Sequence, residues 1–425
     1  MQNAKRREDP PEMKRNFVMG LLHGIFFTGG MAFSNPTAIL PVFLDSLTGS
    51  KTIVGFFSTV MQSGSFLPQL FVASWIRGRK RTKPVLILAI VVRMLCWGVL
   101  GFLTYFYGAD NPAWVLFSLF FLLTLFSFMG GVAVIPFMDI FGGTIPSTLR
   151  GRFFGHRQLW GGLLAVGAGL AVRHILGNES IPFPRNYALL FLLSFLLIGI
   201  SYIALGSVKE PTGRIPPRDR SFRFFLREAL GVLQQSRNYR RFIITRILAG
   251  AGGLALPFYV LYAKDELNVS LAMVGTFVSA QMFGGILSNL LWAHLSDFMG
   301  NRRVIQICVL LRFLVPLTAL LIPASCSRVY VLVFVLLGCV TSAEAIGPTN
   351  FILDISPDDM RPTYVSVAGT LTAPIMFFPL LGGLLLRYVS YMSVFILAAA
   401  LVAAGLILSF FLEEPRVKRL QADRS

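Results

Sequence analysis

Glu344 is a carboxylate inside a long apolar stretch that ends near Ile355. It lies about eleven residues from that end, roughly 16 Å along a helix. A carboxylate held away from water can load and release a proton near neutral pH, so Glu344 is a candidate for proton coupling or for binding an amine. The alternative is a structural ion pair with Arg312, which lies at similar depth in the preceding antiparallel stretch. The functional and the structural interpretation are compatible if Arg312 releases Glu344 during the functional cycle.

Other ionisable side chains also lie inside apolar stretches, where an unpaired charge is costly. His23 is suited to carrying protons, although an isolated histidine is also a common structural residue. Asp139 and Arg157 lie at similar depth on neighbouring stretches, which predicts an ion pair with a structural and gating role. Arg246 is near enough to the start of its stretch to extend toward the membrane surface.

Uncharged polar side chains and helix breakers indicate where a cavity would lie. Three glycines and a proline between positions 250 and 257 interrupt one stretch, and Asn35-Pro36 interrupts another. Backbone groups freed by such breaks are tolerated only where protein or a watery cavity satisfies them. The candidates for lining the cavity are Asn35, Gln62, Gln158, Trp160, Gln281 and Thr349.

The elements that carry these residues are strongly apolar. Of the 425 residues, 55% are hydrophobic and only 14% are charged, which is typical of a multi-pass membrane protein. The net charge of +18 comes from Lys and Arg in the segments between apolar stretches, where membrane topology explains them, so we do not expect nucleic-acid binding. The four cysteines lack metal or redox spacing and no nucleotide-binding turn is present, so we expect no metal and no cofactor.

Twelve apolar stretches are long enough to cross a bilayer. They begin near Phe17, Thr52, Pro84, Ala113, Phe153, Tyr187, Phe242, Leu271, Val304, Val329, Thr363 and Ser390. Basic residues fall on alternate connections, which places both termini in the cytoplasm. The expected architecture is all-α, with an N-tail at 1–16, a six-helix bundle at 17–207, a cytoplasmic linker with an amphipathic helix at 208–241, a second six-helix bundle at 242–412 and a C-tail at 413–425.

The two halves of the chain are internal repeats. The pairs that match at one offset are Val54-Gly55 with Val274-Gly275, Gln69 with Asn289, and Ala73 with Ala293. Arg93 in the third stretch matches Arg312 in the ninth, which indicates that both arginines began as part of the scaffold.

One charged turn has a recognisable pattern. It reads Ala293-His294-Leu295-Ser296-Asp297-Phe298-Met299-Gly300-Asn301-Arg302-Arg303. The pattern resembles the loop signature of the major facilitator superfamily, with Ala293 where that family has Gly. The resemblance implies twelve membrane helices in two pseudo-symmetric six-helix bundles, and a secondary transporter that works by alternating access.

The resemblance also implies gating contacts on the cytoplasmic side. Asp297 is expected to face the start of the fifth helix. Arg302 or Arg303 is expected to reach Asp354, at the end of the tenth helix. Contacts of this kind form only while that side is closed, so they bias the conformational equilibrium rather than bind substrate.

The corresponding turn of the first half departs from the pattern, because Arg77 stands where the family has Asp. Asp358 and Asp359 come just before the eleventh helix. One hypothesis is therefore a charge-swapped contact between Arg77 and one of these carboxylates. The alternative is that Arg77 only contributes to the positive charge of the cytoplasmic face.

Together these features predict a secondary active transporter of a small organic solute, coupled to protons, and not an enzyme. The alternatives are an uncoupled facilitator, a lipid translocase and a non-transporting membrane receptor or scaffold. We expect the protein to act as a monomer in a plasma membrane, the inner membrane if the host is bacterial, with the solute, protons and the lipid bilayer as its partners. The Phe- and Met-rich stretches favour a neutral, amphipathic or cationic solute.

Overall fold

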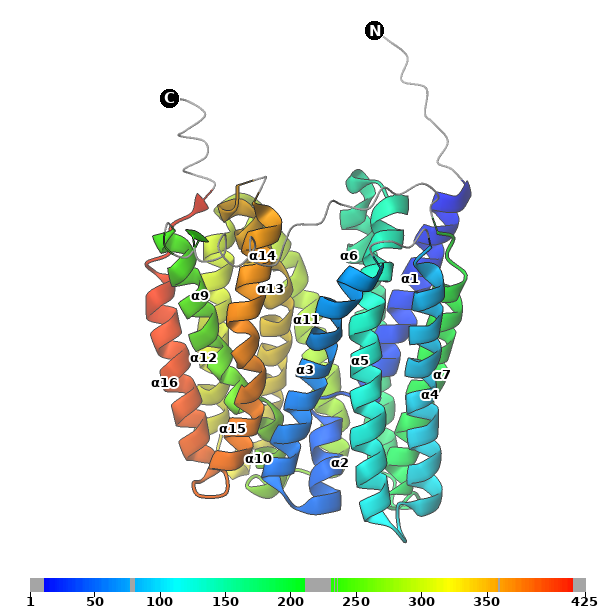
Figure 1. Cartoon of the computed structure of the whole chain (residues 1–425). Coiled ribbons are helices and arrows are strands. Elements are labelled where there is room, and N and C mark those ends of the chain that lie inside the picture. The colour runs from blue at the N-terminus through cyan, green and yellow to red at the C-terminus, as the bar shows by residue number, and fades with distance from the viewer. Residues whose placement is uncertain are drawn as a thin grey trace, which may run out of the picture. The chain divides into compact units, whose positions relative to one another are not determined.

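The computed structural model describes residues 11–76, 81–210, 231–232, 234, 236–357 and 360–415. Throughout these residues the regular structure is helical, and no strand is present (Figure 1). Arg77, Asp358, Asp359 and most of the expected linker at 208–241 lie outside the described residues, and so do both ends of the chain.

The chain forms two compact units that do not coincide with its two sequence halves. Of the described residues, the first unit contains those within 1–34, 61–168 and 180–217, and the second contains those within 35–60, 169–179 and 218–425. Two short segments of the first half therefore pack with the second half. The domain boundaries expected from the sequence stay a prediction.

The first unit is a helical bundle in which α4 packs on both α5 and α7, and α1 packs on α7. Its elements are α1 (Pro11–Ala32), the greater part of α3 (Lys51–Ile76), α4 (Lys83–Tyr107), α5 (Pro112–Thr144), most of α6 (Ser147–Leu176) and α7 (Arg185–Gly206). Trp97 of α4 is fully buried between Phe126 of α5 and Phe191 of α7. Large aromatic side chains therefore fill the space where three helices meet.

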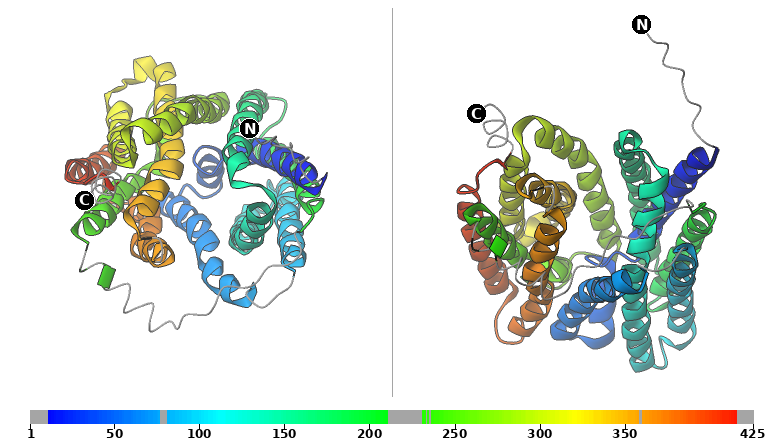
Figure 2. Two further views of the ribbon diagram at one scale, coloured as in Figure 1. Left: turned by 90° about the horizontal axis from the view of Figure 1, so that it is seen from above. Right: turned by 45° about the horizontal axis from the view of Figure 1, so that its top comes forward.

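The second unit is a larger bundle, in which α13 packs on α11 and α12, and α16 packs on α9 and α12. Most of its long helices are seen nearly end-on in the left view of Figure 2. Its elements are α2 (Ile39–Thr48), α9 (Arg237–Gly250), η1 (Ala251–Leu254), η2 (Leu256–Phe258), α10 (Tyr259–Asp265), α11 (Leu271–Met299), α12 (Asn301–Leu321), η3 (Ala324–Tyr330), α13 (Val331–Ile355), α14 (Arg361–Thr372), η4 (Ala373–Phe377), α15 (Phe378–Leu385) and α16 (Tyr391–Ser409).

Ten segments among the described residues are long and apolar enough to cross a membrane. The twelve membrane helices expected from the sequence are consistent with these ten segments. The first expected helix corresponds to α1 and α2 taken together, and the second corresponds to α3. Many large apolar side chains on these helices are exposed, including Leu290 at 73% and Ile203 at 71%. Lipid covers such surfaces, so the chain is an integral multi-pass membrane protein.

Two of the places where glycine or proline is expected to interrupt a helix are broken, and two others are not. The α-helical pattern of α9 ends at Gly250 and continues as two short 3-10 segments up to Phe258. The chain also leaves the α-helical pattern between Ala32 and Ile39, around Asn35-Pro36. By contrast, α5 and α13 run unbroken through Pro136 and Pro348.

Candidate functional site

Glu344 and Arg312 form an ion pair between α13 and α12. A terminal nitrogen of Arg312 lies 2.5 Å from Oε1 of Glu344, and the side chains are 20% and 41% exposed respectively. The other terminal nitrogen of Arg312 donates to the carbonyl oxygen of Ala249 at 3.1 Å. The pair is charge-assisted, which makes it stronger than a contact between neutral groups.

The break in α9 explains why Arg312 fits there. Where α9 changes to the 3-10 pattern, the carbonyl oxygen of Ala249 accepts from the backbone N–H of Ala251 and also from the guanidinium of Arg312. A carbonyl oxygen has two lone pairs, so it can accept both hydrogen bonds. Gly252 follows in η1, and a Cβ at that position would lie 3.2 Å from the Cγ and Cδ atoms of Arg312. Glycine therefore leaves room for the arginine to pass the broken segment.

Arg246 completes a cluster of three charges in the second unit. It is partly buried on α9 and interacts electrostatically with both Glu344 and Arg312. Among the described residues it has no hydrogen-bond or ion-pair partner. The cluster therefore holds two cations and one anion, and no hydrogen bond or ion pair to a described residue fixes the Arg246 guanidinium.

The face of α13 that carries Glu344 is polar and exposed. Thr341, Glu344, Ala345 and Thr349 are all exposed, and their spacing places them on one side of the helix. A carboxylate in the middle of a membrane helix is not tolerated against lipid, so this face must border water or protein. Thr349, expected from the sequence to line a cavity, shares this face.

Two arginines in the first unit lie against aromatic rings. The guanidinium of Arg93 lies 4.1 Å from the ring centre of Phe126 and 5.4 Å from that of Phe27. Arg157 lies 5.0 Å from the ring centre of Phe137. Each arrangement is a cation–π interaction, which stabilises a desolvated cation more than an exposed one. The expected pairing of Arg157 with Asp139 stays a prediction.

His23 is buried and hydrogen-bonded in the first unit. Its Nδ1 lies 2.6 Å from the hydroxyl oxygen of Ser201, and that hydroxyl donates to the carbonyl oxygen of His23 at 2.8 Å. A serine hydroxyl has only one hydrogen, so Nδ1 must be the donor to the oxygen. Phe27 and Tyr202 pack against the ring. This environment fits the structural interpretation of His23, and its proton-carrying role stays a prediction.

The six cavity candidates lie in different environments. Asn35 is buried, accepts hydrogen bonds from the backbone N–H groups of Thr37 and Ala38, and donates to Gln281 at 3.2 Å. Asn35 and Gln281 thus anchor the start of α2 on α11 in the second unit. Four of the candidates are exposed, namely Gln62, Gln158, Trp160 and Thr349. That they line a cavity stays a prediction.

The motif turn between α11 and α12 is held by Asn301. Its side chain accepts from Ser296 at 2.7 Å and donates to Asp354 at 2.5 Å. Arg302 instead contacts Glu414 through its backbone N–H and Phe410 through its guanidinium. Asp297 is exposed. The contacts expected of Asp297, Arg302 and Arg303 stay predictions, as do those of Arg77, Asp358 and Asp359, which lie outside the described residues.

Comparison with known proteins assigns a family to the second half. Residues 241–425 match the family model described as Major Facilitator Superfamily. A comparison with curated proteins gives no sequence match. The comparison with solved structures covers nearly the whole chain. A mutant form of the nucleoside transporter NupG superposes with a TM-score of 0.69 at 13% identity, covering 94% of this chain and 99% of that one.

The chain has the major facilitator fold. A bacterial homologue of the iron transporter ferroportin, in its inward-facing state, gives a TM-score of 0.68 at 14% identity, with 94% of this chain and 98% of that chain covered. A POT family transporter in complex with a thioalcohol-conjugated peptide gives 0.67 at 14% identity, with coverages of 93% and 95%. The resemblance found in the sequence is thus confirmed, and the similar structures are transporters rather than enzymes.

A second charge cluster was not anticipated from the sequence. Asp45 of α2 is bound by Lys51 at 2.6 Å and by Lys264 at 2.8 Å. Lys51 also binds Asp265 at 2.7 Å, and the hydroxyl of Tyr391 donates to Asp265 at 2.7 Å. The Asp45 side chain is only 5% exposed. The cluster joins segment 35–60 to the rest of the second unit.

A signal for this cluster was present in the sequence. The offset that relates Val54 to Val274 also relates Asp45 to Asp265. The two carboxylates occupy equivalent positions in the repeats, and the structure shows both bound to the same Lys51 amine.

Two glycines at equivalent positions of the repeats allow close helix crossings in the second unit. A Cβ on Gly55 would lie 2.2 Å from the carbonyl oxygen of Pro379, where α3 crosses α15. A Cβ on Gly275 would lie 2.1 Å from the backbone nitrogen of Arg173, where α11 crosses the end of α6. Only glycine permits these backbone distances, so the two crossings are matching features of the repeats.

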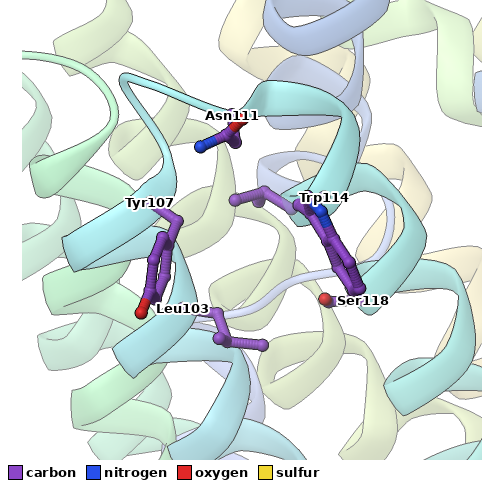
Figure 3. Close-up of a pocket in the computed structure, with 6 residues that line it drawn as sticks. Leu103, Tyr107, Asn111, Trp114 and Ser118 are labelled. Atoms are coloured by element: carbon purple, nitrogen blue, oxygen red, sulfur yellow. The ribbon is translucent and has the colours of Figure 1, made fainter.

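A cavity of about 350 Å³ lies in the first unit where α4 ends and α5 begins. Tyr107 and Trp114 stand on either side of Asn111, which lies in the turn (Figure 3). The residues that line it are Leu103, Tyr107, Asn111, Trp114, Val115 and Ser118. Aromatic residues at helix ends, such as Tyr107 and Trp114, are typical of the membrane surface.

Within the part of the chain that the structure describes, no group of His, Cys, Asp and Glu side chains is arranged to hold a metal ion.

Proposed function

We propose that the chain is a secondary active transporter, which moves a small organic solute across a membrane by alternating access and couples this movement to protons through Glu344. The observation that supports coupling most directly is the placement of Glu344 on an exposed polar face deep in a membrane helix, paired with Arg312. Protonation of the carboxylate would remove its charge and weaken the pair. The proton and the conformation of the site would thereby be linked.

The surroundings of Glu344 fit a group that changes charge during a cycle. Arg312 is on α12, Arg246 is on α9, and the thiol of Cys308 lies near all three charges. The break in α9 at Gly250 lies next to Arg312 and gives the backbone a place to move. The similar structures are a nucleoside transporter, a homologue of an iron transporter and a peptide-binding transporter, so the fold alone does not select a solute.

The test is solute-dependent proton movement. The full chain is reconstituted in liposomes containing a pH-sensitive dye and exposed to a broad panel of solutes. We expect at least one solute to move protons with the wild type and not with Glu344→Gln, while solute binding is retained. The matched control is Asp110→Asn, which makes the same chemical change in an exposed turn.

Two results would contradict the proposal. Solute flux without proton movement in either protein would identify an uncoupled facilitator and leave Glu344 as a structural partner of Arg312. Proton movement that persists in Glu344→Gln would assign coupling to another group, with His23 as the next candidate. By the same proposal the protein acts as a monomer with both termini in the cytoplasm, in the plasma membrane or the bacterial inner membrane.

A further inference from the structure

The charge balance deep inside the second unit is positive. Arg246 lies about nine residues from the start of α9, and Arg312 and Glu344 lie about eleven from the membrane-surface ends of α12 and α13. These distances correspond to roughly 14 to 16 Å along a helix, well inside a bilayer core about 30 Å thick. Because α9 begins at Arg237, Arg246 lies farther along its helix than the apolar stretch beginning near Phe242 indicates. The other charged side chains described in this unit lie near helix ends. One carboxylate therefore faces two guanidinium groups.

An unbalanced cation at this depth is costly unless an anion is supplied. Glu344 neutralises Arg312 through the 2.5 Å contact, and Arg246 receives only the more distant field of the same carboxylate. Arginine is well suited to bind a carboxylate or phosphate, because its planar group donates several parallel hydrogen bonds. The exposed face of α13 that carries Glu344 leaves room for such a group beside the pair.

We propose that Arg246 and Arg312 bind an anionic group of the transported solute, a carboxylate or a phosphate. Glu344 is then the internal counter-ion, which neutralises part of their positive charge when the solute is absent. This inference rests on the proposed transport function and names the class of substrate. It reverses the preference for a neutral or cationic solute that the apolar composition suggests.

The arrangement gives a physical reason for coupling. A solute anion and the ionised Glu344 compete for the same two arginines, so neutralising Glu344 with a proton favours the anion. Because linkage is reciprocal, binding of the anion favours the proton to the same extent. Proton and anion would bind together and leave together.

Anion binding is tested on the purified full chain without a membrane gradient. The probes are inorganic phosphate, succinate and benzoate, with the neutral matches succinamide and benzamide and the cation benzylamine. The melting temperature is measured against probe concentration at constant ionic strength. We expect at least one anion to stabilise the wild type saturably, and its neutral match and benzylamine to have no effect.

Variants locate the site. Glu344→Gln removes the competing carboxylate, so it should bind the effective anion at least about tenfold more tightly. Arg246→Gln should weaken binding by about tenfold or more, equivalent to about 1.4 kcal/mol. Arg246→Lys, which keeps the charge, should recover part of the loss. Arg328→Gln, an exposed arginine in η3, is the matched control and should bind like the wild type.

Three results would overturn the inference. Stabilisation by benzylamine that disappears in Glu344→Gln would identify a cation site. Failure of every anion to stabilise even Glu344→Gln would show that the freed arginines do not bind anions. Unchanged anion affinity in Arg246→Gln would place the site elsewhere. Since binding is measured without flux, failure of transport in liposomes would refute the proposed function and leave the assignment of the site standing.

Discussion

Replacing Asp45 with asparagine removes the carboxylate that holds two lysines in the cluster of Asp45, Lys51, Lys264 and Asp265. The Asp45 side chain is 5% exposed, whereas Lys51 and Lys264 are 21% and 31% exposed. Breaking a fully buried pair costs about 3–5 kcal/mol, and an exposed pair contributes about 1 kcal/mol or less. The intermediate exposure of the lysines leads us to expect about 2 kcal/mol for Asp45→Asn.

This loss should loosen segment 35–60 from the rest of the second unit. Thr59 is suited to detect this loosening, because it is only 3% exposed while the segment is packed. Its hydroxyl accepts a hydrogen bond from the backbone N–H of Leu380 at 3.2 Å. The assay is labelling of Thr59→Cys by a membrane-impermeant maleimide, with exposed Cys326 replaced by serine. A shift of about 2 kcal/mol corresponds to labelling about thirty times faster in Asp45→Asn.

The control is Asp110→Asn, an exposed carboxylate in the turn between α4 and α5, which should leave the labelling rate unchanged. Lys264→Gln should have a smaller effect than Asp45→Asn, because Lys51 still binds the carboxylate. A change of less than about threefold in Asp45→Asn would refute the reasoning. It would mean that backbone crossings such as Gly55 on Pro379 hold the segment without help from the charges.

The remaining predictions concern packing and buried polar groups, each read out as the melting temperature of the purified protein. Gly338→Ala should destabilise by about 1–3 kcal/mol, because its Cβ would lie 1.9 Å from the carbonyl oxygen of Gln281; an unchanged melting temperature would show that α11 and α13 can separate freely. Tyr239→Phe should cost about 1 kcal/mol by removing the hydrogen bond to the carbonyl of Tyr364, and a gain in stability would contradict this. Arg93→Gln should be destabilising and Arg93→Lys less so, since lysine keeps the cation between Phe27 and Phe126; equal losses would argue that charge is unimportant there.

The sequence predicted those parts of the structure that depend on local pattern and depth. Apolar stretches of bilayer length predicted the all-α membrane fold. Counting residues from the ends of two antiparallel helices placed Arg312 and Glu344 at one depth, and the structure brings them into contact. The glycines after Ala249 predicted the break in α9. They did not predict that the carbonyl oxygen of Ala249 would accept a hydrogen bond from Arg312.

Contacts between distant segments could not be predicted in the same way. Asp45 and Lys264 are 219 residues apart, and no helical periodicity relates them. Asn35 is equally instructive, because a polar residue at a helix break suggested a cavity, whereas its side chain is used to start α2 and to bind Gln281. A single sequence does not distinguish an amide that lines a path from one that satisfies the backbone.

The placement of segment 35–60 in the second unit has a consequence for synthesis of the chain. Thr52 donates to the carbonyl oxygen of Gly383, which is 331 residues later. At roughly 5–20 residues per second, a ribosome needs about 20–70 s to travel between these two positions. During that time Asp45 has no Lys264 and Gly55 has no α15 to pack against. Until then the early helices stay in the membrane with Asp45 bound by Lys51 alone and with the backbone around Gly55 uncovered.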